Sequence, residues 1–463
     1  MTSSSGDIPA SRLGRTARIG GLAASQTAKY AGTRAANVTR PRHQRKLAIE
    51  RRHLQAADQI LAVLGTMKGP AMKIGQLLSF VDLGLLPKDV RPHFQRRLAT
   101  LCDAAPQIPF ETMEPVLAAS LGTPVTSVFR DFDPAPIGIA SIGQVYRATT
   151  LDGRDVAVKV QYPKIVAAAK ADLKNLSILL RFAKGLAPSV DMHSLGAELT
   201  DRFLEELDYT REAASHRELA DAFAGHPFIV VPAPVEELCG PHVIVTEFVE
   251  GADFDGLRAR PPEDRDRAGE ILVRFYFGSL FHLGRFSGDP HPGNLKVLPD
   301  GRLAFFDFGS FKVLDERRLG IVRGTLRAVA EGRGADAVSL LADEGILFRP
   351  DRVDAEQALG YFYDTCGWFL EDEALTMTPR VASEAILQSL APATDYREEM
   401  RGQDLPVEWA LLVRTVVSAM ALLGQLTATA NWHRIAREWV YGDPPATELG
   451  QLEADFFARP RGD

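Results

Sequence analysis

Cysteine is scarce in this 463-residue chain: Cys102, Cys239 and Cys366 lie far apart and form no Cys-x-x-Cys pair. This distribution argues against a disulfide framework and against a cysteine zinc site, and it indicates a reducing compartment. The first residues contain no apolar segment of the kind found in secretory signals. We therefore expect a cytoplasmic protein, and its 46% hydrophobic and 24% charged residues are typical of a globular chain with a sizeable core.

Long hydrophobic runs are also scarce. The most apolar stretch, Leu405 to Leu423, contains Glu408 and Arg414. Charged side chains are costly inside a bilayer. We therefore interpret this stretch as a buried or amphipathic helix rather than a membrane span.

Acidic residues are almost missing from the start of the chain. The net charge is −7, yet residues 1–52 hold eleven Lys or Arg against only Asp7 and Glu50. We expect residues 1–44 to form a basic, flexible leader. Such a leader is usually solvated, and the alternative is attraction to an anionic membrane surface, which would place the protein at the inner face of a membrane. No aromatic pattern supports a nucleic-acid partner.

The hydrophobic period changes along the chain. Residues 45–125 show helical spacing, whereas QVYRATTLDGRDVAVKVQYP predicts two strands around a turn at Asp152-Gly153. A further strand is predicted in HVIVTEFVEG, and the chain is mainly helical from Glu263 onward. Strands followed by helices predict a two-lobed α+β fold that is mostly helical overall.

Four short motifs occur in the order of a protein kinase. The signature is a glycine-rich loop ending in valine, a lysine in a V-A-I-K strand, D-x4-N and D-F-G. Each motif alone is weak, but the four together, in order and in the expected structural context, are specific. They are Gly138, Ala140, Gly143 and Val145 in the loop; Lys159 in VAVK; Asp289 and Asn294 in GDPHPGN; and DFG at 307–309.

These residue types suit phosphoryl transfer, which depends on positioning and charge neutralisation. Backbone amides of the loop at 138–143 would cover the phosphates of ATP, and Lys159 would contact the α- and β-phosphates. Asp307 and Asn294 would supply hard oxygen ligands for Mg²⁺. Asp289 would accept the proton of an attacking hydroxyl or orient an attacking water. ATP and Mg²⁺ are therefore the predicted cofactors.

Two further positions belong to this machinery. Lys159 needs a carboxylate partner on a helix, and helical geometry does not choose among several acidic residues. Glu247, in VTEFVEG, fits the connector whose backbone would hydrogen-bond adenine. The candidate partners of Lys159 are Glu198, Glu205, Glu206, Asp208 and Glu212.

Three elements of an ordinary protein kinase are missing. The middle glycine of the loop is Ala140, and Ser287-Gly288 stand where a His-Arg pair usually precedes the catalytic aspartate. No Ala-Pro-Glu follows DFG, so the chain lacks a long regulated activation segment. We therefore expect a substrate other than a typical peptide.

Across residues 45–440 the chain resembles the UbiB family of atypical kinases, also called aarF-domain or ADCK-type kinases. The resemblance is carried by KxGQ at Lys73 to Gln76, GIAS at 138–141 running into IGQVYRA, and ELDYTREA with its ExD motif at Glu206. DPHPGN and DFG complete it. In place of the family's alanine triplet the loop has Gly138, Ile139 and Ala140, followed by Ser141, which puts the nucleotide preference in question.

The resemblance implies a two-lobed protein-kinase-like fold with an N-terminal helical KxGQ extension over the active site. Lys73 and Gln76 would then face the site, and Glu212 would be the partner of Lys159. Family members bind ATP with Mg²⁺, tend to act as ATPases, and are linked to ubiquinone biosynthesis and isoprenoid lipids. The implied domains are a leader at 1–44, the KxGQ extension at 45–125, an N-lobe with a helical insertion at 126–249 and a helical C-lobe at 250–463.

Three functions compete at this point. The first is an ATP- and Mg-dependent atypical kinase or ATPase in ubiquinone or other isoprenoid-lipid metabolism, with a lipid or quinone precursor as partner. The second is a small-molecule phosphotransferase of the aminoglycoside-kinase type, against which KxGQ and ELDYxxEA argue. The third is a nucleotide-gated lipid-binding or chaperone-like protein without a phosphoryl acceptor.

Overall fold

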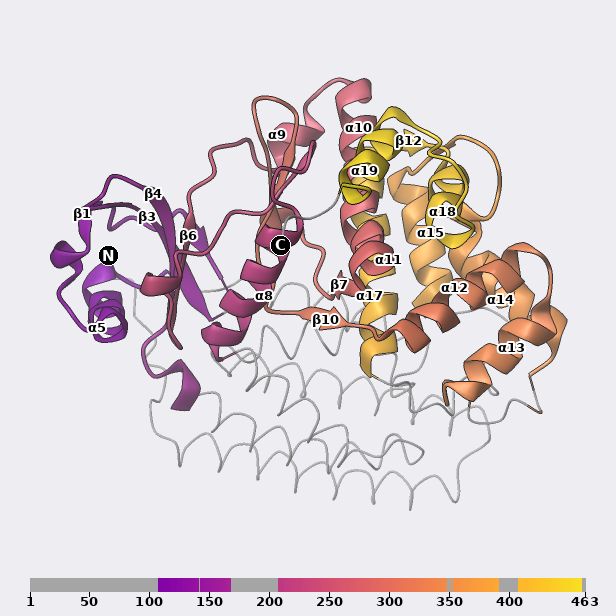
Figure 1. Cartoon of the computed structure of the whole chain (residues 1–463), viewed down its shortest axis with the longest axis horizontal. Helices are drawn as coiled ribbons and strands as arrows, with labels where there is room; N and C mark the ends of the chain where they lie inside the picture. Colours follow the sequence, from indigo (N-terminus) through magenta and orange to yellow (C-terminus); the bar gives the residue numbers. More distant parts are fainter. Residues whose placement is uncertain are drawn as a thin grey trace, which may run out of the picture. The chain divides into compact units, whose positions relative to one another are not determined.

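The structure is a computed structural model of the chain (Figure 1), and it describes residues 107–140, 142–167, 207–347, 351, 353–390 and 407–459. The chain divides into two compact units. The first comprises Met1–Gly153, Ala157–Asp208 and Gly240–Val243, and the second Arg154–Val156, Tyr209–Cys239 and Ile244–Asp463. Lys73, Gln76, Ser141 and Glu206 lie outside the described residues, so the predictions made for them stay predictions. The four domain ranges given above also stay predictions.

The first unit contains most of an antiparallel sheet. Its strand order is β1-β3-β4-β6, with β2 paired to β3. Val156, Val158 and Val160 alternate along β4 and are fully buried, as expected for a strand with one face on the core. The elements of this unit are α5 (Phe110–Leu121), the 3₁₀ turn η1 (Val125–Ser127), β1 (Phe129–Phe132), β2 (Gly138–Ile139), β3 (Gly143–Thr150) and most of β4 (Asp155–Gln161). The last strand of the sheet, β6 (Val243–Glu247), has only Val243 in the first unit, and its other residues belong to the second.

The turn between β3 and β4 confirms the sequence prediction. Gly153 has a φ of +94°, a region that favours glycine. Its N–H donates to the Thr150 carbonyl oxygen at 3.0 Å. The Asp152-Gly153 pair therefore reverses the chain between two strands, as its composition predicts.

The second unit is mainly helical, with short strands in three small sheets, β10-β7, β11-β12 and β5-β9-β8. Its helices are α8 (Tyr209–Ala222), α9 (Phe254–Arg258), α10 (Pro262–Val273), the π-helix η3 (Arg274–Gly278), α11 (Ser279–Leu283), α12 (Glu316–Ala330), α13 (Gly334–Asp343), α14 (Ala355–Cys366), α15 (Pro379–Leu390), α17 (Val407–Leu426), α18 (Trp432–Val440) and α19 (Glu448–Phe457), with 3₁₀ turns η2 (Glu236–Leu238), η4 (Pro292–Asn294) and η6 (Gly367–Phe369). Its strands are β5 (Ile229–Val230), β7 (Arg285–Ser287), β8 (Leu295–Val297), β9 (Leu303–Phe305), β10 (Phe311–Val313), β11 (Leu375–Thr376) and β12 (Thr429–Ala430).

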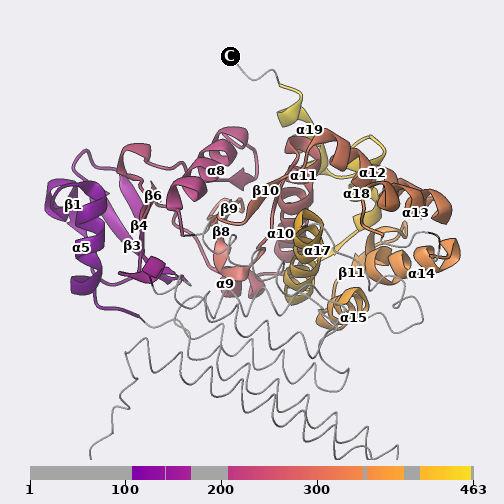
Figure 2. The same ribbon diagram turned by 90° about the horizontal axis from the view of Figure 1, so that it is seen from below.

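Helix α17 passes through the interior of this unit, beside α10 (Figure 2). Met420, Leu423 and Leu426 are fully buried in its second half. The prediction of a buried or amphipathic helix in this part of the chain is confirmed. Within the described ranges no helix combines the length and hydropathy that crossing a membrane requires.

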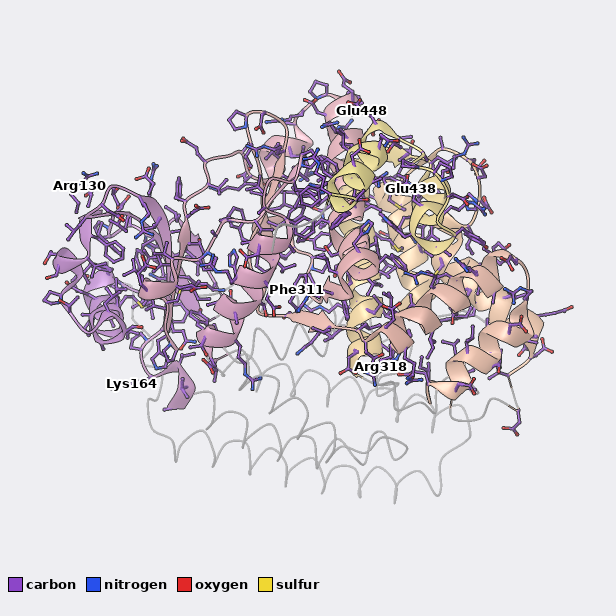
Figure 3. All side chains as sticks on the ribbon, in the orientation of Figure 1. Arg130, Lys164, Phe311, Arg318, Glu438 and Glu448 are labelled. Carbon is purple, nitrogen blue, oxygen red and sulfur yellow. The ribbon has the colours of Figure 1, made fainter. Side chains whose placement is uncertain are left out.

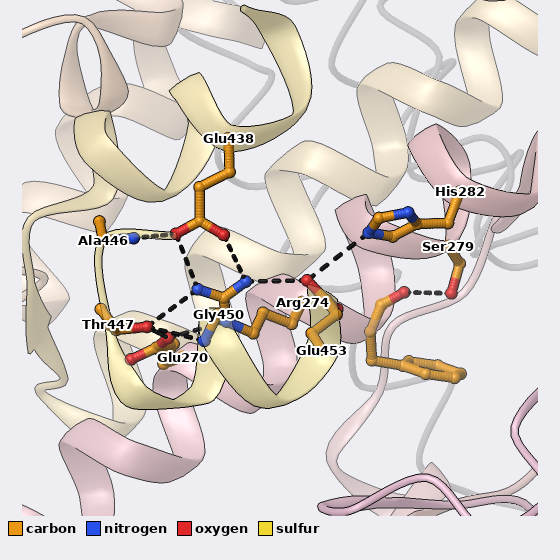
Figure 4. Close-up of polar contacts among 10 residues, drawn as sticks. Glu270, Arg274, Ser279, His282, Glu438, Ala446, Thr447, Gly450 and Glu453 are labelled. Carbon is orange, nitrogen blue, oxygen red and sulfur yellow. Dashed lines mark hydrogen bonds and ion pairs between the residues drawn. The ribbon is translucent and has the colours of Figure 1, made fainter. Parts of the chain in front are cut away.

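A buried ion cluster joins the C-terminal helices to the middle of the unit (Figure 4). Arg274 is fully buried, and its guanidinium contacts Glu270, Glu438 and Glu453 at 2.8–2.9 Å. A hydrogen bond to Thr447 Oγ1 at 3.0 Å completes the set, so all five N–H donors of the guanidinium are used. The cluster therefore links α10 and η3 to α18 and α19.

Gly450 explains how α19 can approach this cluster. A Cβ at this position would lie 2.5 Å from Arg274 Nη2 and 2.8 Å from Glu438 Oε1. Any side chain here would push into the ion cluster. The absence of a side chain at 450 is thus required by the close packing of α19.

Candidate active site

Strands β2 and β3 form an antiparallel hairpin. Gly138 pairs with Val145 and Ile139 with Gln144, and the Ala140 N–H donates to the Gly143 carbonyl oxygen at 2.8 Å. A Cβ on Gly138 would meet only the Val145 side chain, at 3.7 Å, which is an ordinary contact. The strand pair therefore forms with Ala140 in place of a middle glycine, and the contact of this hairpin with phosphates stays a prediction.

Lys159 and Glu247 lie on strands. Lys159 is half-buried on β4, in the first unit, between the fully buried Val158 and Val160. Glu247 is exposed at the end of β6, and its carboxylate accepts a hydrogen bond from the Ala233 N–H at 3.1 Å. The expected contact of its backbone with adenine stays a prediction.

Two antiparallel strand pairs gather the acidic residues of the second unit. β8 pairs with β9 so that Leu295 faces Phe305, and the Phe306 N–H donates to the Asn294 carbonyl oxygen at 2.8 Å. Asn294 is therefore next to Asp307, although the two are separated in sequence. The Asn294 side chain donates to the Asp289 carbonyl oxygen at 3.4 Å.

The second strand pair, β7 with β10, brings together the segments that follow β7 and precede β10. Ser287 faces Phe311, and the Gly288 N–H donates to the Ser310 carbonyl oxygen at 3.0 Å. This register brings the residues after β7 beside those before β10. Together the two pairs place Asp289, Asn294 and Asp307 in one small region. From the sequence, the proximity of these three residues follows only by analogy with the order of motifs in protein kinases.

Asp307 has an unusual backbone. Its φ is +64°, which is rare for a non-glycine residue. Its Oδ1 accepts a hydrogen bond from the Gly309 N–H at 3.2 Å, and this local bond helps to hold the left-handed conformation. The left-handed backbone fixes the orientation of the Asp307 carboxylate. Unusual backbone conformations of this kind cluster at functional positions.

One face of α8 packs against the DFG segment. Glu212 and His216 are one helical turn apart and both are buried. The His216 ring meets the Phe308 ring edge-on at 4.6 Å, and a Cβ on Gly309 would lie 3.3 Å from Glu212 Oε2. Glu212 therefore lies beside Gly309 in the second unit, whereas Lys159 belongs to the first, and the ion pair between them stays a prediction.

Aromatic side chains pack beside the region that contains Asp289, Asn294 and Asp307. Phe308 also packs edge-to-face against Phe311, which is labelled in Figure 3, with ring centroids 5.6 Å apart. The nearby Tyr276 is buried, and burial together with the charges of Asp289 and Asp307 raises the pKa of its phenol. The tyrosine is thus a neutral group close to both aspartates.

A family of known proteins matches the part of the chain that carries these residues. The family model of the ABC1 atypical kinase-like domain matches residues 100–336, which include the hairpin, Lys159 and DFG. The chain belongs to the ABC1 atypical kinase-like family. This confirms the resemblance to the UbiB and aarF-domain kinases.

Relatives in the ABC1 family carry kinase names. Protein ACTIVITY OF BC1 COMPLEX KINASE 1, chloroplastic, of Arabidopsis thaliana is 34% identical over 60% of this chain and 41% of its own length. AarF domain-containing protein kinase 1 of Xenopus laevis is 30% identical over 57% of this chain and 51% of its own length. Atypical kinase COQ8B, mitochondrial, of Rattus norvegicus is 30% identical over 76% of this chain and 68% of its own length. The chain thus spans about half or less of the length of the first two.

A solved structure shares the fold. The complex of Rv3197 with erythromycin from Mycobacterium tuberculosis matches 84% of this chain and 97% of that chain, at 31% identity and a TM-score of 0.62. The mixture of helices and small sheets expected from the sequence is therefore that of an ABC1-type, kinase-like fold.

The donor set of this ABC1 chain suits magnesium bound with a nucleotide. Mg²⁺ in such sites takes one or two protein ligands, with phosphates and waters as the rest. Asp307 and Asn294 are hard oxygen donors brought together by the β8–β9 pair. Among the described residues, no group of three or more His, Cys, Asp or Glu is arranged to hold a metal by itself. The residues therefore fit Mg²⁺ shared with nucleotide phosphates.

One residue near the predicted site was not foreseen. Arg414 of α17 contacts Asp289, with Nη2 and Oδ1 2.5 Å apart. Sequence reasoning noted Arg414 only as a charge that makes a membrane span unfavourable. The available signal was that charge inside an apolar helix, since buried arginines are generally paired.

Proposed function

We propose that this protein is an ATP- and Mg-dependent atypical kinase or ATPase that supports ubiquinone or other isoprenoid-lipid metabolism. The observation that carries the proposal is the convergence of Asp289, Asn294 and Asp307 through the two strand pairs. Phosphoryl transfer needs this combination of a hydroxyl-directed carboxylate and hard oxygen donors. Membership of the ABC1 family, whose relatives are named kinases, supports it.

The residues have separate roles in this proposal. Asp307 and Asn294 would hold Mg²⁺, which neutralises charge on the β- and γ-phosphates when it is bound with ATP. Lys159 would contact the α- and β-phosphates and pair with Glu212. Asp289 would orient an attacking hydroxyl or water and receive its proton.

The finer architecture is part of the same proposal. We infer two kinase-like lobes with the KxGQ extension over the site, so that Lys73 and Gln76 replace the platform for a peptide. The partner would be a lipid or a quinone precursor. The basic leader, with seven Lys or Arg in residues 1–44, would bring the protein to the inner face of an anionic membrane.

Metal-dependent nucleotide binding tests the core of the proposal. Asp307→Asn should abolish the part of the ATP-induced thermal shift that depends on Mg²⁺. Asp300→Asn is the matched control, because Asp300 lies in the turn between β8 and β9 and pairs with Arg302. A folded Asp307→Asn protein with an unchanged Mg-dependent shift would contradict the assignment.

The fate of the phosphoryl group separates the candidate functions. ATP turnover is measured with quinone precursors, isoprenoid lipids and erythromycin, since a relative was solved with that macrolide. A phosphorylated product would establish a kinase. Stimulated turnover without such a product would favour the nucleotide-gated lipid-binding protein instead.

A further inference from the structure

The ion pair between Arg414 and Asp289 is largely withdrawn from water. Arg414 is 6% exposed and the Asp289 side chain 20%, with Nη2 and Oδ1 2.5 Å apart. Taking two charges out of water costs free energy that their attraction often does not recover. A pair of this kind at Asp289, the proposed hydroxyl-directed carboxylate, is therefore better explained by positioning than by stability.

Helix α17 is fixed against the same segment by contacts other than this pair. Thr415 is fully buried, and its hydroxyl lies 2.6 Å from the Ser287 carbonyl oxygen, to which it can donate. A Cβ on Gly288 would lie 3.2 Å from Leu411 Cδ2 and 3.1 Å from the Ser310 carbonyl oxygen. The small residues at 287 and 288, which stand where other kinases have His-Arg, thus allow α17 to approach closely.

The contact uses only one oxygen of Asp289. Arg414 reaches Oδ1, and within the part of the chain that the structure describes Oδ2 takes part in no hydrogen bond or ion pair. A two-pronged arginine contact would instead occupy both oxygens. The observed geometry fixes the orientation of the carboxylate and leaves its second oxygen available to a reacting group.

We propose that Arg414 is the positioning residue of Asp289, holding Oδ1 so that Oδ2 meets the attacking hydroxyl or water. This inference rests on the proposed phosphoryl-transfer function. The guanidinium comes from a helix far along the chain, and not from the residue before the aspartate. It does not take the proton itself, since an arginine stays protonated in proteins.

Steady-state ATP turnover of the full chain tests the role. Arg414→Gln should lower kcat by about 10- to 100-fold, the effect of a misplaced catalytic group, while KM for Mg-ATP stays within about twofold because ATP contacts are untouched. Arg414→Lys keeps the charge and a donor for Oδ1, so its kcat should lie between that of Arg414→Gln and wild type. Val413→Gln, on an adjacent residue that is 42% exposed, is the control and should match wild type.

A double-mutant cycle distinguishes positioning from a general structural effect. In an Asp289→Asn background, Arg414→Gln should change residual turnover by less than about twofold, because the group it orients has gone. Wild-type kcat in Arg414→Gln, an increased kcat, or an equal loss in both backgrounds would overturn the proposal. Where the residual turnover of Asp289→Asn is too low to measure, an equal loss of kcat in Arg414→Lys and Arg414→Gln would overturn the proposal.

The outcome also separates this inference from the proposed function. A wild-type protein that turns over ATP while Arg414→Gln behaves normally would reject only the role of Arg414. A wild-type protein without Mg-dependent nucleotide binding or turnover would reject both. Thermal unfolding of each variant identifies any loss that comes from misfolding.

Discussion

Replacing Arg274 by methionine removes the cation from a buried cluster that contains three carboxylates. Glu453 is 3% exposed, Glu438 8% and Glu270 12%, and Arg274 itself is fully buried. Methionine retains a long apolar stem but supplies none of the five hydrogen-bond donors. The carboxylates would be left without their common partner.

The expected loss of stability is large. Removing one partner of a buried ion pair costs about 3–5 kcal/mol. With an m-value of about 3 kcal/mol/M in urea, the unfolding midpoint should fall by about 1 M or more. Arg274→Lys keeps the charge but has only three donors, so its loss should be intermediate.

Tryptophan fluorescence during urea unfolding measures this loss. All four tryptophans of the chain belong to the second unit, so the signal reports on that unit. Arg434→Met is the matched control, because Arg434 forms an exposed pair with Asp372 at 2.7 Å and solvent screens such pairs. Its midpoint should stay near that of wild type.

Two results decide the reasoning. Adding Glu453→Gln to Arg274→Met should restore part of the stability, since it removes one uncompensated buried charge. If Arg274→Met lost no more than Arg434→Met, the cluster would not stabilise the unit and the argument would be wrong.

Three further outcomes are expected. Burial lowers the pKa of His226 from 6.5 to about 4. The stability that the neutral His226 ring contributes should therefore be fully present above pH 6.5 and fall by about 3 kcal/mol as the pH approaches 4, and His226→Asn should flatten this pH dependence in urea titrations. Lys159→Met should abolish ATP turnover while the fold persists. Glu212→Ala should reproduce this loss and Glu206→Ala should not. If Glu206→Ala abolished turnover and Glu212→Ala did not, the choice of Glu212 as the partner of Lys159 would be wrong. Deleting residues 1–40 should weaken co-sedimentation with anionic vesicles most at low salt, at about 1 kcal/mol per engaged basic residue; equal binding to neutral vesicles would reduce the leader to a solvated tail.

Local features of the fold were predictable because short stretches of sequence determine them. The turn at Asp152-Gly153 depends on one glycine with a φ of +94°, and the flanking strands follow from their alternation of buried residues. Strands β11 and β12 have two residues each. Such short pairs carry no periodicity, so the sequence could not reveal them.

The acidic centre was predictable in part. The order of the kinase motifs indicated Asp289, Asn294 and Asp307, but helical spacing could not distinguish Glu212 from Asp208. In the structure Glu212 shares a face of α8 with His216, against Phe308 and Gly309. That placement depends on tertiary packing, which single-sequence reasoning does not contain, and the pairing of Glu212 with Lys159 stays a prediction.

Arg414 shows the limit most clearly. It lies 125 residues from Asp289 in sequence, and nothing in the composition of α17 indicates which element its charge meets. Long-range pairs of this kind follow from the way a helix packs. They become visible only when the fold is known.

The packing of α17 also determines how much chain a working fragment needs. A fragment that ended at residue 336, where the ABC1 match stops, would retain every motif from the hairpin to DFG. It would nevertheless expose Gly288 where Leu411 packs and leave Arg274 without Glu438 and Glu453. Expression of this protein in parts should therefore extend through α19, and inactivity of a shorter piece would reflect lost packing rather than the wrong choice of motifs.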